Sequence, residues 1–256
     1  MVKKKVLIFI ISYKASYRIK DVFNKIPFQK LKNYNLEILL SDDASKDDTM
    51  KYAKLIKANN KTKKITIKTN NKNIGYGAHI KKCLRYSLKK NFQYAVMIHG
   101  DGQFDPKYIP ELLKYISNFE NVSACTGSRI LKGKKNASKG GMPLYKLIGN
   151  IVLTKIFNFF MNKNYTDAHT GLWAYNLKFL KNLKFNILTD GFNFDQELRF
   201  RNILDKKTIK EIPIKTRYGN ERSQLHIKYA FNFFIRTLLF FLIKKKIIKS
   251  KKFILR

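Results

Sequence analysis

Cysteine, proline and glycine are scarce in this 256-residue sequence, with 2, 5 and 12 residues respectively. The two cysteines, Cys83 and Cys125, lie in apolar or small-residue surroundings without metal-type spacing, so we expect buried thiols in a reducing compartment. A 45% share of apolar residues and 14% aromatics supports a real hydrophobic core. These proportions exclude disorder along the whole chain.

Acidic residues are also few. The chain has 17 Asp and Glu against 53 Lys and Arg, which gives a formal charge of +36. Such an excess favours polyanions, whether nucleic acid, an anionic membrane surface or phosphorylated substrates. A nucleic-acid-binding protein gathers its cations on one face beside stacking aromatics. Here the lysines are spread through every segment, as on a general solvated surface, so we expect no nucleic-acid partner.

Long hydrophobic runs are missing. The start, MVKKKVLIFIIS, has a short apolar run without a small-residue cleavage site, so it predicts a first buried strand rather than a signal peptide. The segment 229–243 is shorter than the roughly 20 residues that cross a bilayer, and it contains Arg236. It predicts an amphipathic helix lying in the plane of an anionic membrane surface. The alternative is a core helix, and we expect no second hydrophobic segment.

Apolar runs alternate with helical patterns in the first half of the chain. Because such alternation is typical of a parallel sheet covered on both faces, we predict an α/β fold. Further along, we expect a strand at 121–127, a Gly- and Lys-rich loop, a helix at about 143–160 and an edge strand at 209–214. We divide the chain into a domain at 1–225 and a basic amphipathic tail at 226–256. The early strands are expected at 6–11, 36–40, 65–67 and 94–98, and the helices at about 16–26, 48–58 and 77–89.

The few acids concentrate after two of these strands. SDDASKDDT and HGDGQFDP together hold 6 of the 17 acidic residues, at the carboxyl ends of strands where parallel sheets bind ligands. In an extended segment His99, Asp101 and Gln103 would point the same way and offer imidazole and oxygen ligands to Mg²⁺ or Mn²⁺. The alternative is a β-turn in which Asp105 and Pro106 begin a helix, and the capping role of Asp105 fits either interpretation.

The second acidic stretch divides between two roles. Asp42 and Asp43 lie close to the strand end and suit hydrogen bonds from a nucleobase or from ribose hydroxyls. Asp47 or Asp48 is expected to cap the following helix. Gly75 and Gly77 predict a tight turn before a helix, because no G-x-G-x-x-G pattern follows them.

The order of these motifs resembles family 2 glycosyltransferases of the GT-A type, in the branch of dolichol-phosphate mannosyltransferases and related polyprenyl-phosphate glycosyltransferases. The resemblance covers about residues 5–225. It implies a Rossmann-like, mostly parallel sheet with flanking helices. The matching segments are ISYKAS, SDDASKDDT, NIGYGAHIKKCL, HGDGQFDPKYIPEL, TGSRI, GGMPLYKLIGNIVLT, DAHTGLWAY, DGFNFDQEL and IKEIPIKTRYGNERSQ.

The resemblance also implies roles for single residues. In the family a D-x-D motif followed by Gln binds metal and diphosphate; its second Asp and its Gln fall on Asp101 and Gln103, and His99 replaces its first Asp. Trp173 stands where the family usually carries Arg, so one phosphate contact is missing. The resemblance implies donor-nucleotide contacts from Asp42, Asp43, Ser12 and Gly75, acceptor-phosphate contacts from Arg129, Arg217 and Arg222, and catalytic roles for Asp101, Asp195 and Arg129.

The expected reaction is inverting transfer of a hexose from a UDP- or GDP-sugar to a polyprenyl or dolichyl phosphate, at the cytoplasmic face of the membrane. A phosphate acceptor is already ionised near neutral pH, so it attacks without a general base once cations hold it in place. The alternative acceptor is a sugar hydroxyl in a cell-surface glycan. That reaction needs a carboxylate to take the proton, and Asp195 is the natural candidate.

Overall fold

A seven-stranded sheet forms the centre of the molecule in the computed structural model, which describes residues 2–133, 137–138, 140–218 and 227–250. The strand order is β3-β2-β1-β4-β6-β5-β7. β6 runs antiparallel to both of its neighbours, while the other pairs are parallel. The strands are β1 (Lys5–Ser12), β2 (Asn35–Asp42), β3 (Ile65–Thr69), β4 (Tyr94–His99), β5 (Val122–Ser128), β6 (Trp173–Asn176) and β7 (Thr208–Pro213).

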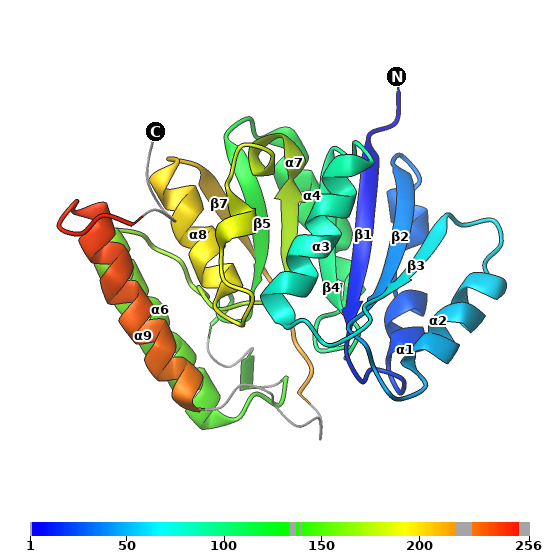
Figure 1. The fold of residues 1–256 in the computed structure, drawn as a ribbon, viewed down its shortest axis with the longest axis horizontal. Helices are drawn as coiled ribbons and strands as arrows, with labels where there is room; N and C mark the ends of the chain where they lie inside the picture. The colour runs from blue at the N-terminus through cyan, green and yellow to red at the C-terminus, as the bar shows by residue number, and fades with distance from the viewer. Residues whose placement is uncertain (1, 134–136, 139, 219–226, 251–256) are drawn as a thin grey trace.

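Helices cover both faces of this sheet (Figure 1). One hydrophobic cluster lies between the sheet and α1, α2 and α4, and a second lies between the opposite face, α3 and α8. The mostly parallel α/β fold expected from the sequence is therefore confirmed. The helices are α1 (Ile19–Asn24), α2 (Thr49–Ala58), α3 (Tyr76–Lys89), α4 (Ile109–Asn118), α6 (Leu144–Met161), α7 (Leu177–Leu180), α8 (Phe194–Leu204) and α9 (Ile227–Lys244).

The first four strands agree with the sequence because β1, β2 and β4 are buried on both sides and therefore read as continuous apolar runs. The predicted edge strand is confirmed as β7. β6 was not predicted: its four residues are too few to show a period, and its pairing with β4 and β5 comes from distant segments. Both cysteines are free and buried, as expected.

α6 and α9 lie side by side at one end of the molecule, away from the first three strands (Figure 1). α9 confirms the helix predicted at 229–243. The expectation that no other hydrophobic segment exists was wrong. Within the described ranges, α6 is the helix that is long and apolar enough to cross a membrane, and 28% of it is buried in the protein.

Candidate functional site

Asp42 ends β2 at the carboxyl edge of the sheet, Asp43 follows it directly, and both are buried. Asp42 accepts hydrogen bonds from the backbone and hydroxyl of Ser45. One oxygen of Asp43 accepts from Asn70 Nδ2 at 2.7 Å and from the Ile74 amide. The two carboxylates therefore hold the loops that follow β2 and β3 in place. The nucleoside contact that the resemblance implies for them would be an additional role.

Gly75 and Gly77 form the tight turn predicted before α3. Gly75 has a φ of 89°, a conformation that glycine adopts without strain, and its amide donates to Asp43 Oδ2 at 3.1 Å. A Cβ on Gly77 would lie 2.5 Å from the Thr189 carbonyl oxygen. The glycines therefore let the start of α3 approach the loop before α8, which brings Tyr76 toward Asp195.

Ser12 lies between the two acidic stretches. β1 stands between β2 and β4, the amide of Asp43 donates to the Ser12 carbonyl, and the amide of Gly100 donates to the Ile11 carbonyl. The Ser12 hydroxyl is buried and has no hydrogen-bond partner among the described residues. A buried hydroxyl without a partner is costly, so this atom is a candidate contact for a ligand at this edge of the sheet.

His99, Asp101 and Gln103 follow one another at the end of β4. The segment after His99 is a turn rather than an extended strand, because Gly102 has a φ of 74° and the Gln103 amide donates to Asp101 Oδ1 at 2.9 Å. Asp105 accepts from the Lys107 amide and begins a short 3-10 turn with Pro106, which confirms its capping role. The expected extended segment is therefore wrong, because a turn follows His99, and the shared metal role of His99, Asp101 and Gln103 stays a prediction.

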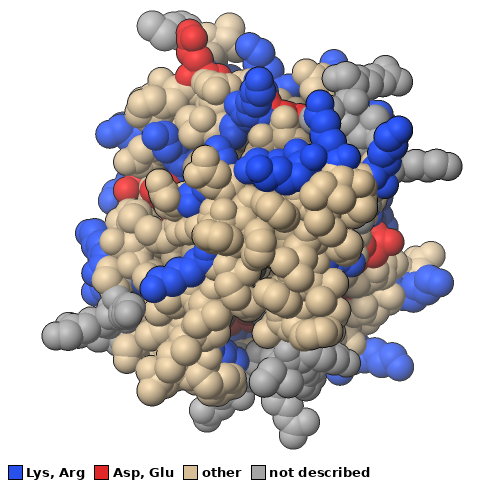
Figure 2. Space-filling model, turned by 90° about the vertical axis from the view of Figure 1, so that its left-hand side faces the viewer, with Lys and Arg blue, Asp and Glu red and all other residues tan. Residues whose placement is uncertain are grey.

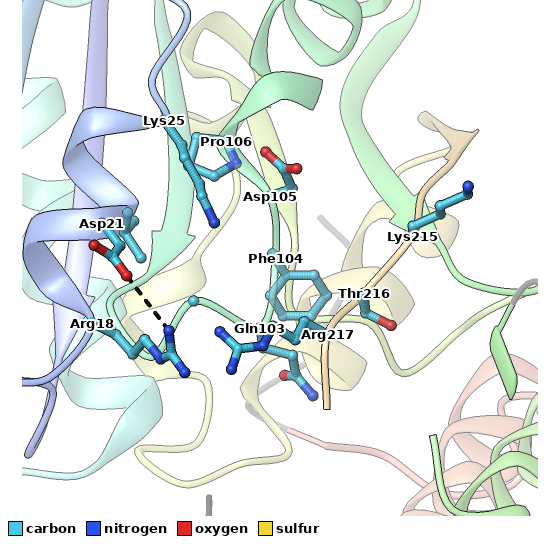
Figure 3. Close-up of a pocket in the computed structure, with 12 residues that line it drawn as sticks. Arg18, Asp21, Lys25, Gln103, Phe104, Asp105, Pro106, Lys215, Thr216 and Arg217 are labelled. Atoms are coloured by element: carbon cyan, nitrogen blue, oxygen red, sulfur yellow. Dashed lines mark hydrogen bonds and ion pairs between the residues drawn. The ribbon is translucent and has the colours of Figure 1, made fainter. Parts of the chain in front are cut away.

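The chemistry of the His99 side chain suits metal binding. Burial lowers the pKa of its imidazole, although the charge of Asp101 opposes this. The neutral imidazole that results is the form that coordinates metals. Within the described residues, no group of three His, Cys, Asp or Glu side chains could hold a metal. Of the predicted set, His99 and Asp101 are such side chains, whereas Gln103 lines a cleft together with Arg18 and Arg217 (Figure 3).

Half-buried Tyr76 pairs with buried Asp195 beside this turn, and sequence reasoning missed the tyrosine. The Tyr76 hydroxyl donates to Asp195 Oδ2 at 2.7 Å and lies 3.5 Å from His99 Nε2. Burial raises the pKa of the Asp195 carboxyl to about 7, against the hydrogen bond from Tyr76 and the charge of Arg199. Its other oxygen is buried without a partner in the described structure. Asp195 is therefore a candidate proton acceptor near neutral pH.

Arg129 is held in a buried ion pair with Asp167. Its Nε donates to Asp167 Oδ2 at 2.6 Å and its Nη2 to Oδ1 at 2.8 Å, while Nη1 donates to the Tyr218 hydroxyl. Burial would raise the pKa of the Asp167 carboxyl, but the charge and hydrogen bonds of Arg129 outweigh it and hold the pKa at about 2. The pair joins the end of β5 to the segment before β6.

The remaining predicted arginines follow β7. The Arg217 amide donates to the Gln103 carbonyl at 3.0 Å, and Phe104 forms a β-bridge with Thr216. This pairing brings Arg217 to the candidate metal turn, a link between distant segments that has no local sequence signal. Arg222 lies outside the described residues. Trp173 is fully buried in β6, and the guanidinium of Arg199 lies 5.0 Å from its ring centroid.

Solved structures of nucleotide-sugar-dependent transferases share this fold. A glucosyl-3-phosphoglycerate synthase from Mycobacterium tuberculosis, solved with Mn²⁺ and UDP, matches 96% of this chain and 82% of its own, with a TM-score of 0.61 and 14% identity. A mannosyltransferase from Pyrobaculum calidifontis, solved with GDP-Man and Mn²⁺, matches 98% of this chain and 66% of its own, with a TM-score of 0.61 and 12% identity. At these identities the similarity establishes the GT-A type of fold.

Sequence comparison establishes the family. The model of glycosyl transferase family 2 matches residues 7–184, and the chain belongs to this family. It is a glycosyltransferase, as expected from the order of its motifs. A UDP-N-acetylglucosamine–dolichyl-phosphate N-acetylglucosaminyltransferase from Methanococcus voltae is 30% identical over 93% of this chain and 97% of the relative. An undecaprenyl-phosphate mannosyltransferase from Micrococcus luteus is 26% identical over 70% of each chain.

Proposed function

We propose that this glycosyltransferase moves a hexose from a UDP- or GDP-sugar to a polyprenyl phosphate with inversion at the anomeric carbon. The similarity to the Methanococcus dolichyl-phosphate enzyme carries this proposal, because it extends over 93% of this chain and 97% of the relative. Ser12, Asp42, Asp43 and Gly75 are the proposed donor contacts. Their positions at the carboxyl edge of the sheet support this role, since ligands of parallel α/β sheets bind there.

The proposed chemistry is a direct displacement. A phosphate oxygen of the acceptor forms the new bond to the anomeric carbon, the bond from that carbon to the diphosphate breaks, and its electrons leave with the nucleoside diphosphate. His99, Asp101 and Gln103 would hold Mg²⁺ or Mn²⁺, and the imidazole suits Mn²⁺ better. When bound, the cation neutralises charge on the leaving diphosphate. Arg129, Arg217 and Arg222 are the proposed acceptor-phosphate contacts.

Product formation with matched acceptors tests the proposal. Purified protein, Mn²⁺ and a UDP- or GDP-sugar are combined with a polyprenyl phosphate, with the corresponding polyprenol or with an oligosaccharide, and the products are separated. We expect transfer to the phosphate alone, because only this acceptor carries an ionised nucleophile. Transfer to the oligosaccharide without transfer to the lipid phosphate would exclude the proposal and support the glycan alternative.

The variant Asp195→Asn separates the two acceptors by mechanism. For a phosphate acceptor we expect kcat to fall less than about tenfold and to keep the wild-type pH profile, because no base is needed. For a hydroxyl acceptor, loss of the base would cost about 10²–10⁴-fold. The wild-type rate would then rise with pH through about 7, where Asp195 ionises. Initial rates of wild type and Asp195→Asn, measured between pH 5.5 and 8.5, distinguish a phosphate acceptor from a hydroxyl acceptor.

We further propose that the protein binds peripherally to an anionic membrane surface through α6 and α9, on the cytoplasmic side. Figure 2 looks onto the end of the molecule where these helices lie and shows a mostly uncharged centre with Lys and Arg around it. Apolar side chains recur along each helix at intervals that keep them on one face. The exposed ones are Leu144, Ile148, Val152 and Phe159 on α6, and Phe231, Ile235 and Leu239 on α9.

Vesicle sedimentation tests this surface. The double variant Phe159→Glu/Phe231→Glu is expected to bind phosphatidylglycerol vesicles at least about tenfold more weakly than wild type, because it loses buried apolar area and adds charge near anionic headgroups. Phe119→Glu, at the end of α4 and also exposed, is the matched control and should bind like wild type. Equal binding by all three proteins would rule out α6 and α9 as the membrane contact.

A further inference from the structure

α9 has two faces of different chemistry. One carries the exposed apolar side chains of the proposed membrane surface. The other face recurs with the same helical spacing and is turned toward the rest of the protein. Its residues are Tyr229, Phe233, Arg236, Thr237 and Phe240. α9 is therefore joined to the protein by polar contacts as well as by apolar packing.

The polar contacts of this second face are made with α8. The side-chain amide of Gln196 donates to the Thr237 hydroxyl and to the Phe233 carbonyl, each at 2.9 Å. Glu197 forms an ion pair with Arg236; its carboxylate is fully buried, whereas the Arg236 side chain is 35% exposed. A buried ion pair adds little net stability over well-packed apolar residues, because both charges lose water. The pair is therefore better suited to fixing geometry than to adding stability.

The two carboxylate oxygens of Glu197 hold different parts of the chain. Oε1 contacts the Arg236 guanidinium, and Oε2 accepts from the Thr189 amide at 2.8 Å. Thr189 belongs to the loop 188–193, which directly precedes α8. Hydrogen bonds to a charged group are about twice as strong as neutral ones. One charged group thus joins α9 to this loop.

The loop 188–193 in turn holds the start of α3. The Asp190 carbonyl accepts from the amides of Gly77 and Ala78 at 2.7 Å and 3.1 Å. These amides lie in the first turn of α3, where N–H groups have no partner within the helix. The Asp190 side chain also pairs with Lys81 Nζ at 2.5 Å, one turn further along. The position of the loop therefore sets the position of the start of α3.

The start of α3 lies between the proposed donor contacts and the candidate metal turn. The Gly75 amide donates to Asp43 Oδ2 at 3.1 Å. The ring of Tyr76, the next residue, packs edge-on against the His99 imidazole, with 5.8 Å between the ring centroids. A shift of this helix start would therefore disturb both parts of the candidate site.

Aromatic packing follows the same route from α9 to α3. Tyr229 of α9 lies edge-on to Phe192, with ring centroids 5.2 Å apart. Phe192 belongs to the loop 188–193 and stacks on Tyr76 at a centroid distance of 5.4 Å. Ring contacts of this kind have preferred geometries. The loop is thus held between α9 and α3 by packing as well as by charge.

We propose that Arg236 is a positioning residue of this glycosyltransferase: it holds Glu197, and through the loop 188–193 it keeps the start of α3 in place. In this role Arg236 touches neither the donor nor the acceptor. The effect on donor binding rests on the donor contacts proposed above for Asp43 and Gly75, whereas the link from α9 to α3 does not depend on them.

Hydrogen exchange measured without substrate tests the link itself. In Arg236→Gln we expect the Thr189 amide and the amides in the first turn of α3 to exchange at least about tenfold faster than in wild type, because their acceptors are held less firmly. Exchange in β1 should stay unchanged. Lys245→Gln removes an exposed cation directly after α9 and is the matched control, with wild-type exchange throughout. Unchanged exchange in Arg236→Gln, or an equal rise in Lys245→Gln, overturns the inference.

Donor binding tests the consequence. The Kd for a UDP- or GDP-sugar with Mn²⁺, measured by isothermal titration, should rise at least about tenfold in Arg236→Gln, because a lost contact between a charged group and the donor costs roughly that much affinity. Arg236→Lys keeps the positive charge and should return the Kd to within about threefold of wild type. A smaller folded fraction would lower the number of sites per chain and leave the Kd unchanged. A wild-type Kd in Arg236→Gln therefore overturns the inference.

The double variant Glu197→Gln/Arg236→Gln guards against misfolding. It leaves no buried charge without a partner, so its Tm should exceed that of Arg236→Gln. The new amide still accepts from Thr189, but a neutral hydrogen bond is about half as strong as a charged one. Exchange and Kd should therefore remain raised. Wild-type values of both would show that Arg236→Gln acts only through an unpaired charge, which contradicts the inference.

These measurements contain no acceptor, so failure of glycosyl transfer to polyprenyl phosphate would leave them unaffected. Absence of donor binding by wild type would contradict the proposed function instead. Hydrogen exchange in Arg236→Gln and Lys245→Gln would then decide between a positioning link and independent elements.

Discussion

Replacing Arg129 with methionine is expected to lower the free energy of unfolding by about 3–5 kcal/mol, because it leaves the fully buried Asp167 carboxylate without its cationic partner. For a chain of this size the loss corresponds to a fall in Tm of roughly 10 °C. Thermal melts followed by circular dichroism measure it. Arg85→Met removes an exposed arginine from α3 and serves as the control, with an expected change below about 0.5 kcal/mol.

The double variant Arg129→Met/Asp167→Asn makes the test sharper. Removing the carboxylate charge as well should restore part of the lost stability, because the greatest cost is a buried charge without a partner. Equal melting of Arg129→Met and Arg85→Met would show that the ion pair contributes nothing to the fold.

The ion pair between Arg129 and Asp167 makes the free energy of unfolding decrease as the pH falls. The pKa of Asp167 is held at about 2 in the folded protein, below the ordinary value of 3.8 that applies to the unfolded chain. The unfolded state therefore binds the proton first as the pH falls. The contribution, on the order of 2 kcal/mol, is present above about pH 4 and is lost between about pH 4 and pH 2. In Asp167→Asn this part of the acid dependence should disappear.

Asp101→Ala is expected to abolish the metal-dependent part of donor binding and to lower the rate of glycosyl transfer by at least about 100-fold. Asp101 is the only carboxylate in the proposed set of His99, Asp101 and Gln103, so its removal takes away the charge that holds the cation. Thermal-shift assays with UDP- and GDP-sugars, each with and without Mn²⁺ or Mg²⁺, measure the first effect because a ligand of the folded state raises Tm.

Asp105→Ala is the matched control for this experiment. Asp105 lies in the same turn, accepts from the Lys107 amide and pairs with the Lys107 side chain. Its loss should cost about 1 kcal/mol of stability, as for a helix cap, and leave the metal-dependent shift intact. A full metal-dependent shift in Asp101→Ala would remove this residue from the proposed metal site.

Local signals explain how much of the fold was predictable. β1, β2 and β4 were visible because buried parallel strands are apolar on both sides, and α2 and α3 because their apolar residues recur with the helical period. The cap at Asp105 also depends only on neighbouring residues. β6 escaped prediction because its partners β4 and β5 lie far away in the sequence.

The residues of the candidate site also fall into those with a local sequence signal and those whose partners are distant in the sequence. Asp42, Asp43 and Asp101 were found because acidic residues are few and follow strands directly. Tyr76 was missed, because a tyrosine at the start of a helix looks the same whether or not a carboxylate faces it. Arg129 was recognised as a cation at a strand end, but its bonding to Asp167 depends on a contact 38 residues away.

The sequence by itself determined the alternation of strands and helices, the family, and the edge of the sheet where the acids gather, because each of these is written in local patterns and in the order of the motifs. Only the tertiary structure decided which charges are paired. It brought the Arg129 guanidinium against the Asp167 carboxylate and the Tyr76 hydroxyl against Asp195. The physical reason is that burial and pairing, which set the energy of a charge, are made by side chains that meet only when the chain folds.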